Sequence, residues 1–238
     1  MVSAGSALLN SPDVTQRTRI KICGVCRPED ALLAARFGAD AIGVIFHAPA
    51  SRNISVERAR EILAALPPFV TPVGLFVDWP AEQVLGAARE IGLRHVQLNG
   101  DETPETIAAM TPLVVIKALK VERDGFRAAL SYWRDAIRAH SLSNVAGFVL
   151  ETAGTGKPGG TGVRNDWETV VAAQRAGAFD GLPPIIAAGG LRPETVGDVV
   201  RAVRPYAVDV SSGVEGSLRE KSEAKVRAFV GAVREADA

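Results

Sequence analysis

Cysteine and histidine are scarce in this sequence. The 238 residues contain two cysteines, Cys23 and Cys26, and three histidines. Two cysteines three positions apart are too few for the disulfide framework of a secreted domain. Zinc would need further ligands, which three histidines and a single cysteine pair do not readily supply. The sequence therefore predicts neither a disulfide scaffold nor a metal site.

An excess of charge of either sign is also absent. Lys and Arg number 27, Asp and Glu number 27, and the net charge is zero, so no basic field favours nucleic acid or a membrane surface. No apolar run approaches the ~18 residues of a membrane span. Residues 1–18 lack the basic start and apolar centre of a signal peptide. We expect a cytoplasmic protein in which a loosely ordered extension, 1–18, precedes one domain at 19–238.

What the sequence does contain is a regular alternation of two patterns. Short apolar runs typical of buried strands occur eight times from Arg19 onward, at 19–23, 41–46, 72–77, 95–98, 114–120, 147–151, 185–189 and 207–211. Between them apolar residues recur at helical spacing, as in Phe126, Leu130, Trp133 and Ile137. Ser55 is a candidate helix cap, and Pro28 and Pro193 fit the first turns of helices.

Eight strand–helix units in about 220 residues predict an α/β fold, a single-domain (β/α)8 TIM barrel with parallel strands and right-handed crossovers. The main alternative is a doubly wound open sheet. For a dinucleotide such a sheet needs a Gly-rich turn after the first strand, and the stretch 24–27 reads Gly-Val-Cys-Arg. No linker-like segment divides the chain, which favours one domain.

Polar residues lie where the predicted strands end. In this barrel the chemistry takes place at the carboxyl ends of the strands, where the sequence puts Cys23, Asn99 and Glu151. Strand alternation places Lys21 and Cys23 on one face and Ile20 and Ile22 on the other. A charge and a thiol on one face of a buried strand favour a functional role, although a buried free cysteine is also common in cores.

Two glycine-containing loops follow the last two strands. They are 188–191, which includes Gly189 and Gly190, and 211–215, which includes Ser211, Ser212 and Gly213. Glycines let backbone N–H groups approach an anion, and barrels of this type commonly hold phosphate after strands seven and eight. The pair of loops predicts a phosphate site.

At these positions the sequence resembles the phosphoribosylanthranilate isomerase family of tryptophan biosynthesis. The resemblance covers Arg19 to about Val233, and its motifs occur in order: Lys21-Ile22-Cys23-Gly24, Pro28-Glu29-Asp30, Ser51-Arg52, Val96-Gln97-Leu98-Asn99-Gly100, Gly159-Gly160-Thr161-Gly162 before Asp166-Trp167, Gly189-Gly190-Leu191, and Asp209-Val210-Ser211-Ser212-Gly213-Val214-Glu215.

The resemblance implies an Amadori rearrangement of N-(5-phosphoribosyl)anthranilate to the corresponding aminoketose, with no metal or organic cofactor. It implies Cys23 as the general base and Arg52 as the contact for the anthranilate carboxylate, whose geometry a guanidinium fork matches. It implies that Gly160, Thr161 and Gly162 form a mobile loop over the site. The expected partner is a small phosphorylated substrate, and the expected assembly is a monomer or homodimer.

Two positions depart from the family pattern. Glu151 stands where the family usually has an aspartic acid as general acid, and Asn99 stands where it commonly has a histidine. The extra methylene of Glu151 moves its carboxyl by ~1.5 Å, and Asn99 hydrogen-bonds but does not titrate. Because of these two departures, two alternative functions remain open. The barrel acts on another aminoaldose phosphate, or it binds a phosphorylated ligand without turnover.

Lys21 and Asp209 have two interpretations in the sequence. Lys21 lies one pleat below Cys23 and its charge favours the thiolate that a base requires. Asp209 lies on the last strand, which neighbours the first when a barrel closes, so the two residues form an ion pair in one interpretation. In the other, Asp209 contacts the substrate. Cys23 and Cys26 also form a C-x-x-C motif, but that redox motif normally opens a helix in a thioredoxin-like unit.

Overall fold

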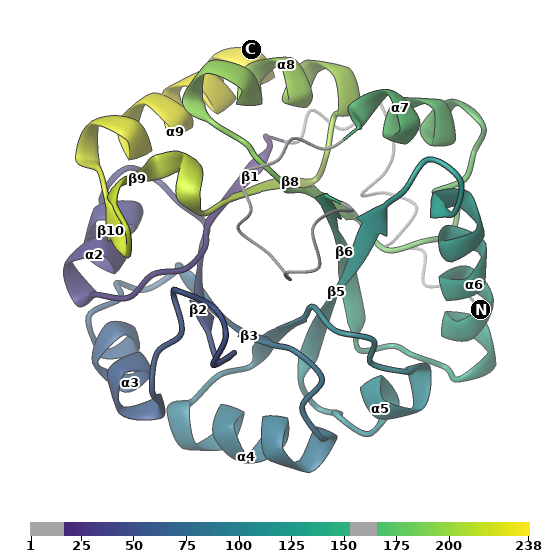
Figure 1. Cartoon of the computed structure of the whole chain (residues 1–238), viewed down its shortest axis with the longest axis horizontal. Coiled ribbons are helices and arrows are strands. Elements are labelled where there is room, and N and C mark those ends of the chain that lie inside the picture. The colour runs from purple at the N-terminus through teal and green to yellow at the C-terminus, as the bar shows by residue number, and fades with distance from the viewer. Residues whose placement is uncertain (1–16, 153–165) are drawn as a thin grey trace.

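Eight parallel strands form a closed barrel in the order of the sequence (Figure 1). The computed structural model describes residues 17–152 and 166–238. Each strand pairs with the next and β8 pairs with β1, so the predicted (β/α)8 barrel is confirmed and the open sheet is wrong. The strands are β1 (Arg19–Ile22), β2 (Ala41–Ile45), β3 (Thr71–Phe76), β4 (His95–Leu98), β5 (Val114–Val121), β6 (Val145–Thr152), β7 (Ile185–Ala187) and β8 (Ala207–Val210).

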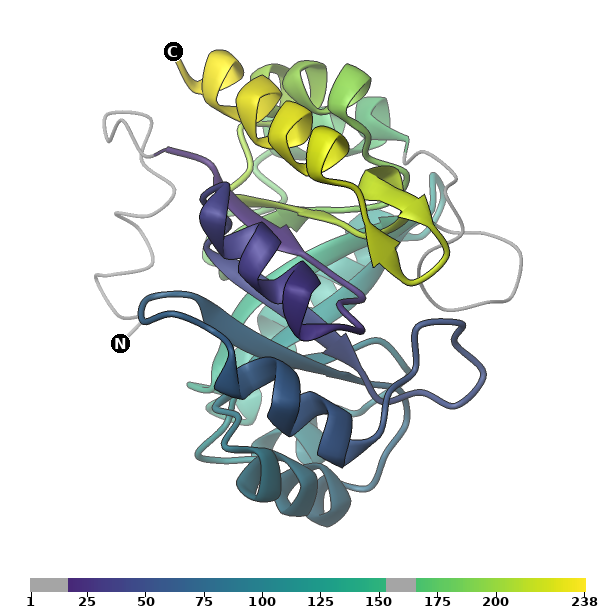
Figure 2. The ribbon, with the colours of Figure 1, turned by 90° about the vertical axis from the view of Figure 1, so that its left-hand side faces the viewer.

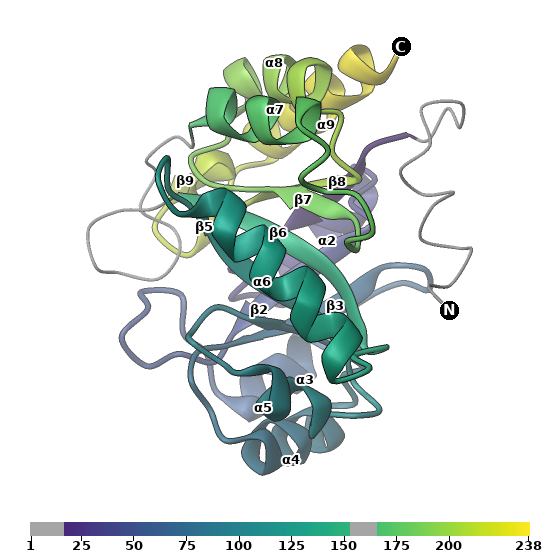
Figure 3. The ribbon, with the colours of Figure 1, turned by 90° about the vertical axis from the view of Figure 1, so that its right-hand side faces the viewer.

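Helices follow the strands and surround the barrel (Figures 1 and 3). The predicted helix starts are confirmed: Ser55 Oγ accepts the N–H of Arg58, and two helices begin at Pro28 and Pro193. The helices are α2 (Pro28–Arg36), α3 (Val56–Ala64), α4 (Ala81–Ile91), α5 (Pro104–Ala108), α6 (Phe126–Ala139), α7 (Trp167–Arg175), α8 (Pro193–Val203) and α9 (Glu223–Asp237). Among the described residues no helix combines the length and apolarity that a membrane span requires.

Strand alternation divides the apolar side chains between two layers. Ile20 and Ile22 belong to the large core between the strands and the helices. A much smaller cluster, made by Val149, Ile186, Ala188 and Ala207, is separate from that core. Val149 alternates with Phe148 and Leu150, which pack in the large core, so the small cluster lies on the inner face of the sheet. Residues that alternate with the outer layer, Lys21 among them, therefore face the barrel interior.

Five strands, β1, β2, β3, β7 and β8, end earlier than their apolar runs, and three of these ends bear on the site. β1 ends at Ile22, β7 at Ala187 and β8 at Val210, whereas the sequence predicted ends at 23, 189 and 211. The chain turns at glycines in positive φ, with Gly24 at 68° and Gly189 at 89°. Cys23, Gly189 and Ser211 therefore belong to the loops at the carboxyl ends of the strands.

A small antiparallel hairpin, which the sequence reading missed, lies between β8 and α9. After the 3-10 turn η1 (Ser212–Val214) the chain forms β9 (Glu215–Ser217) and β10 (Glu220–Lys221). Figure 2 shows this hairpin at the same end of the barrel as the loop after β2. Arg219 Nη1 joins the two, because it donates to the carbonyl oxygens of Ser51 at 2.9 Å and Asn53 at 3.2 Å.

The chain ahead of β1 is attached to the barrel at its last two residues. Thr18 donates from its N–H and its hydroxyl to Asp237 at the end of α9, at 2.9 and 2.6 Å. Arg17 pairs with Asp40. These two residues of the predicted extension thus contact the folded domain, while the rest of it, 1–16, lies outside the described residues.

Candidate active site

A buried ion pair crosses the seam where the barrel closes. Lys21 on β1 and Asp209 on β8 are register partners, and Lys21 Nζ donates to Asp209 Oδ2 at 2.6 Å. Their side chains are 5% and 6% exposed. Burial opposes the charge of Lys21, but the carboxylate of Asp209 and the Cys23 sulfur outweigh it and hold the pKa of Lys21 above its usual value. The structure contains the ion pair, which was one of the two interpretations of Asp209. The second carboxylate oxygen, Asp209 Oδ1, is buried without a hydrogen-bond partner.

Cys23 follows β1 at the mouth of the barrel. Its N–H donates to the carbonyl of Val210 at 2.8 Å and the residue is 6% exposed. Gly43 on β2 makes room for the thiol, since a Cβ there would lie 2.7 Å from Sγ. Burial raises the pKa of Cys23, and the positive charge of Lys21 opposes this without overcoming it. The charge of Asp209 also raises this pKa, so the expected help from Lys21 is limited and the environment favours the protonated thiol.

Glu151 on β6 ends a chain of three hydrogen-bonded side chains. Gln97 Nε2 donates to Asn99 Oδ1 at 2.9 Å, and Asn99 Nδ2 donates to Glu151 Oε1 at 2.5 Å. Burial raises the pKa of Glu151, and the Asn99 hydrogen bond works in the opposite direction. The two positions that depart from the family pattern are thus in direct contact. The short Asn99 side chain and the long Glu151 side chain meet across the barrel mouth.

The backbone that carries Asn99 is held by a buried pair that sequence reasoning missed. Lys117 on β5 contacts Glu102 Oε2 at 3.1 Å and donates to the carbonyl of Gly100 at 2.7 Å. Glu102 accepts the N–H of Gly100 at 3.1 Å. The signal available in the sequence was strand alternation, because it places Lys117 on the same face as the apolar Val115 and Leu119.

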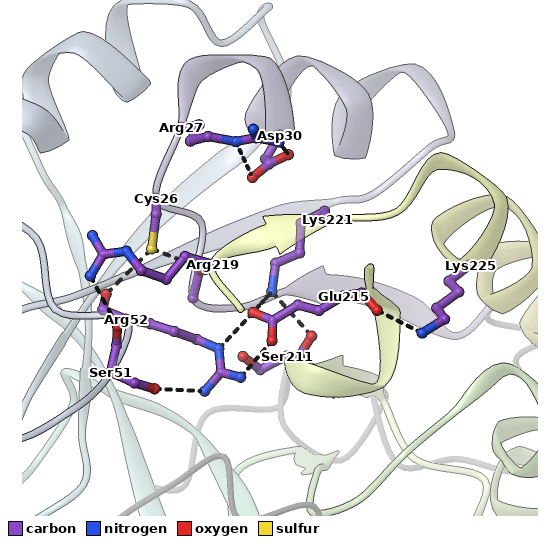
Figure 4. Close-up of polar contacts among 11 residues, drawn as sticks. Cys26, Arg27, Asp30, Ser51, Arg52, Ser211, Glu215, Arg219, Lys221 and Lys225 are labelled. Carbon is purple, nitrogen blue, oxygen red and sulfur yellow. Dashed lines mark hydrogen bonds and ion pairs between the residues drawn. The ribbon is translucent and has the colours of Figure 1, made fainter. Parts of the chain in front are cut away.

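Arg52 lies in the loop after β2 and is paired with a carboxylate of the protein itself. Its Nε and Nη2 donate to the two carboxylate oxygens of Glu215 at 2.7 and 2.6 Å (Figure 4). Glu215 appeared in a family motif but was given no role. It begins the hairpin that the sequence reading missed, so its contact with Arg52 could not be anticipated.

The predicted phosphate loops line one pocket. Its walls are Gly190, Leu191, Arg192, Glu194, Ser212, Gly213 and Lys225. Three of the five predicted phosphate residues, Gly190, Ser212 and Gly213, are in this set. Ser211 lies nearby as a buried hydroxyl without a hydrogen-bond partner, and Gly189 precedes the pocket in the same turn. The cationic residues Arg192 and Lys225 were not predicted.

Other predicted features have simple outcomes. Cys23 and Cys26 are both free thiols. In the stretches 17–152 and 166–238, no three acidic, cysteine or histidine side chains gather as a metal site would require. Gly160, Thr161 and Gly162, the predicted mobile loop, lie outside the described residues.

Comparison with known proteins supplies the family. A model of the family described as N-(5'phosphoribosyl)anthranilate (PRA) isomerase matches residues 20–232. The chain belongs to this family. A relative from Pseudomonas aeruginosa, named N-(5'-phosphoribosyl)anthranilate isomerase, is 45% identical over 217 residues, which are 91% of this chain and 95% of the relative.

Solved structures of the family have the same fold. The crystal structure of phosphoribosyl anthranilate isomerase from Thermotoga maritima has a TM-score of 0.79 and 34% identity, and the match covers 92% of this chain and 99% of that one. A second family structure, in complex with reduced 1-(o-carboxyphenylamino)-1-deoxyribulose 5-phosphate, has a TM-score of 0.76 and 34% identity over the same shares of both chains.

The electrostatics of Cys23 predict that its thiol ionises at a higher pH than a free cysteine. In a Cys26→Ser background, the rate of Cys23 alkylation should rise with pH with a midpoint above the ~8.5 of a free cysteine, because burial disfavours the thiolate. Mass spectrometry of the alkylated protein at a series of pH values measures this midpoint. A midpoint near or below neutrality would show that Lys21 controls the thiol in spite of its pairing with Asp209.

Proposed function

We propose that Cys23 and Glu151 perform the proton transfers of the family's Amadori rearrangement in this chain. The protein is an aldose–ketose isomerase of tryptophan biosynthesis that converts N-(5-phosphoribosyl)anthranilate into 1-(2-carboxyphenylamino)-1-deoxyribulose 5-phosphate. The observation that supports the assignment is that Cys23 directly follows β1 and Glu151 lies near the end of β6, so both stand at the carboxyl ends of the strands, where the charges of Lys21 and Asp209 act on both. The thiol and the carboxyl therefore belong to one barrel mouth.

The first step is opening of the furanose ring. Glu151 in its protonated form gives a proton to the ring oxygen, the bond from C1 to that oxygen breaks, and the anthranilate nitrogen forms a C1=N iminium with its lone pair. The raised pKa of Glu151 suits this task because it keeps a larger fraction of the carboxyl protonated.

The second step is removal of the C2 proton. The thiolate of Cys23 takes it, the C–H electrons form the C1=C2 bond, and the iminium electrons return to nitrogen. The resulting enolamine becomes the aminoketose when the C2 hydroxyl gives up its proton, the O–H electrons form the C2=O bond, and the C1=C2 electrons take up a proton at C1. Because burial favours the protonated thiol, its proton must leave before this step, and in this proposal the ionised form of Glu151 accepts it.

The remaining predicted residues bind the substrate in this proposal. Arg52 contacts the anthranilate carboxylate. The unsatisfied Asp209 Oδ1 accepts from a sugar hydroxyl, and Asn99 holds Glu151. The phosphate lies against Ser211, Ser212, Gly213, Gly189 and Gly190, with the charges of Arg192 and Lys225 beside it. The loop of Gly160, Thr161 and Gly162, the cytoplasmic location and the monomeric or dimeric state stay predictions.

Growth of a tryptophan-requiring host that lacks the isomerase tests the function as a whole. The chain should restore growth without tryptophan, and the purified protein should turn over the anthranilate substrate. A protein that binds reduced 1-(o-carboxyphenylamino)-1-deoxyribulose 5-phosphate but does neither would be a ligand-binding barrel. A protein that turns over only another aminoaldose phosphate would have a shifted substrate.

Replacement of the base should separate catalysis from binding. Cys23→Ala should lower kcat by about 10²–10⁴-fold, while affinity for the reduced product is retained, because only the proton acceptor is lost. The matched control is Cys26→Ser, since Cys26 is buried beside the carbonyl oxygens of Gly24 and Arg52 and has no proposed role. Steady-state kinetics of both variants decide the matter, and near-native turnover by Cys23→Ala would remove the thiol from the mechanism.

Two substitutions of Glu151 should have opposite outcomes. Glu151→Gln keeps the shape but cannot donate a carboxylic proton, so kcat should fall by about 10²–10⁴-fold. Glu151→Asp restores the family's acid and should keep or increase activity. An active Glu151→Gln enzyme would mean that another group protonates the ring oxygen.

The phosphate loops predict a charge-sensitive position. Ser212→Asp should raise KM at least about tenfold, because a carboxylate would face the substrate phosphate at close range. Ser217→Asp, on the exposed part of β9, is the matched control. Competitive inhibition by inorganic phosphate should weaken in the first variant and not in the second, and equal inhibition of both would place the phosphate elsewhere.

A further inference from the structure

Arg52 is held along one edge by Glu215, a residue to which the mechanism gives no task. The pair uses Nε and one N–H of Nη2, and each residue is 8% exposed. A guanidinium carries five N–H donors in a rigid plane. The outer edge, formed by Nη1 and Nη2, therefore keeps a donor on each nitrogen. Among residues 17–152 and 166–238 its contact is a long one of 3.5 Å from Nη1 to Ser51 Oγ.

Glu215 is itself fixed from two directions (Figure 4). Lys221 Nζ lies 3.2 Å from Glu215 Oε1 and donates to the carbonyl of Ser211 at 3.1 Å. Lys225 Nζ donates to the backbone carbonyl of Glu215 at 2.6 Å. Burial alone would raise the pKa of Glu215, but Arg52 and Lys221 hold it below its usual value. Glu215 is thus an ionised carboxylate in a defined position.

The other side of the Arg52 side chain is enclosed by Gly24. A Cβ at position 24 would lie 2.4 Å from Arg52 Cδ and 2.8 Å from Ser211 Oγ. The loop that carries Arg52 is bound in turn to the hairpin by Arg219. Contacts therefore hold the backbone of the Arg52 loop, the aliphatic part of the Arg52 side chain and one edge of its guanidinium. The outer edge of the guanidinium remains available to bind a ligand.

We propose that Glu215 is a positioning residue that orients the outer edge of Arg52 toward the aromatic carboxylate of the substrate. This inference rests on the proposed role of Arg52. Glu215 acts through Arg52 and needs no contact with the substrate. A guanidinium held in plane presents two parallel N–H donors to a carboxylate, whereas a freely rotating one must first be ordered.

A merely structural role would have a different signature. A buried ion pair with one partner removed destabilises a protein, and a loosened barrel mouth would weaken every ligand equally. A positioning role weakens only ligands that carry the carboxylate. The informative quantity is therefore the ratio of two dissociation constants, one for a ligand without the carboxylate and one for the same ligand with it.

The test uses reduced 1-(o-carboxyphenylamino)-1-deoxyribulose 5-phosphate and the same compound with phenyl in place of carboxyphenyl. Their affinities are measured by calorimetry on the full chain and on Glu215→Gln, Arg52→Ala and Glu220→Gln. Glu220→Gln is the matched control because Glu220 lies on the same hairpin but pairs with Arg27. Near-ultraviolet circular dichroism checks that each variant is folded.

We expect Arg52→Ala and Glu215→Gln each to reduce the ratio by about tenfold, and Glu220→Gln to leave it unchanged. Glu215→Gln should raise KM with little change in kcat, because binding common to ground and transition states is lost. If Glu215→Gln does not fold, Glu215→Asp is measured instead. It keeps the charge but withdraws the carboxylate by one methylene (~1.5 Å), so it should also lower the ratio.

Equal weakening of both compounds in the Glu215 variants, with a lowered ratio in Arg52→Ala, would overturn the positioning role and leave the function of Arg52 intact. An unchanged ratio in Arg52→Ala would instead refute the proposed carboxylate contact, and the positioning role with it. The two failures are therefore distinguishable.

Discussion

The ion pair between Lys21 and Asp209 is the interaction on which the barrel mouth depends. It joins the first strand to the last at the seam where the sheet closes, and both side chains are almost fully buried. A single charge at this position would be costly, and removing one partner of such a pair typically costs roughly 3–5 kcal/mol. Mutual neutralisation lets the fold keep two charges inside the barrel, directly below the groups that react.

The same pair also acts on the two proposed reactive groups, Cys23 and Glu151. Burial is the largest influence at Cys23 and at Glu151 and raises the pKa of each, while Lys21 lowers and Asp209 raises both values. A high pKa helps Glu151 to act as an acid and hinders Cys23 as a base. We expect the buried thiol to ionise after the carboxyl, and the reactive form, with the proton on Glu151 and not on Cys23, is then the minor one of two forms that carry a single proton.

The sequence predicted the fold well because its signals are local. The apolar runs of the strands, the apolar residues at helical spacing, and the prolines at 28 and 193 are each recognised from residues that are close together in the chain. At the site, register and alternation were enough to anticipate Lys21 beside Asp209. The contact of Arg52 with Glu215 joins segments 163 positions apart through a hairpin with no periodic pattern, so no local signal reports it. The Asn99–Glu151 hydrogen bond was missed for a similar reason, since each residue was considered singly as a departure.

The most direct measurement is the pH dependence of kcat/KM in the wild-type enzyme and in Glu151→Asp. The reactive form is a constant small fraction between the two pKa values, so a plateau is expected, with the acid limb set by Glu151 and the alkaline limb by Cys23. Glu151→Asp should therefore move the acid limb and leave the alkaline limb in place. A shift of the alkaline limb would contradict the account, because it would show that the thiol ionises before the carboxyl.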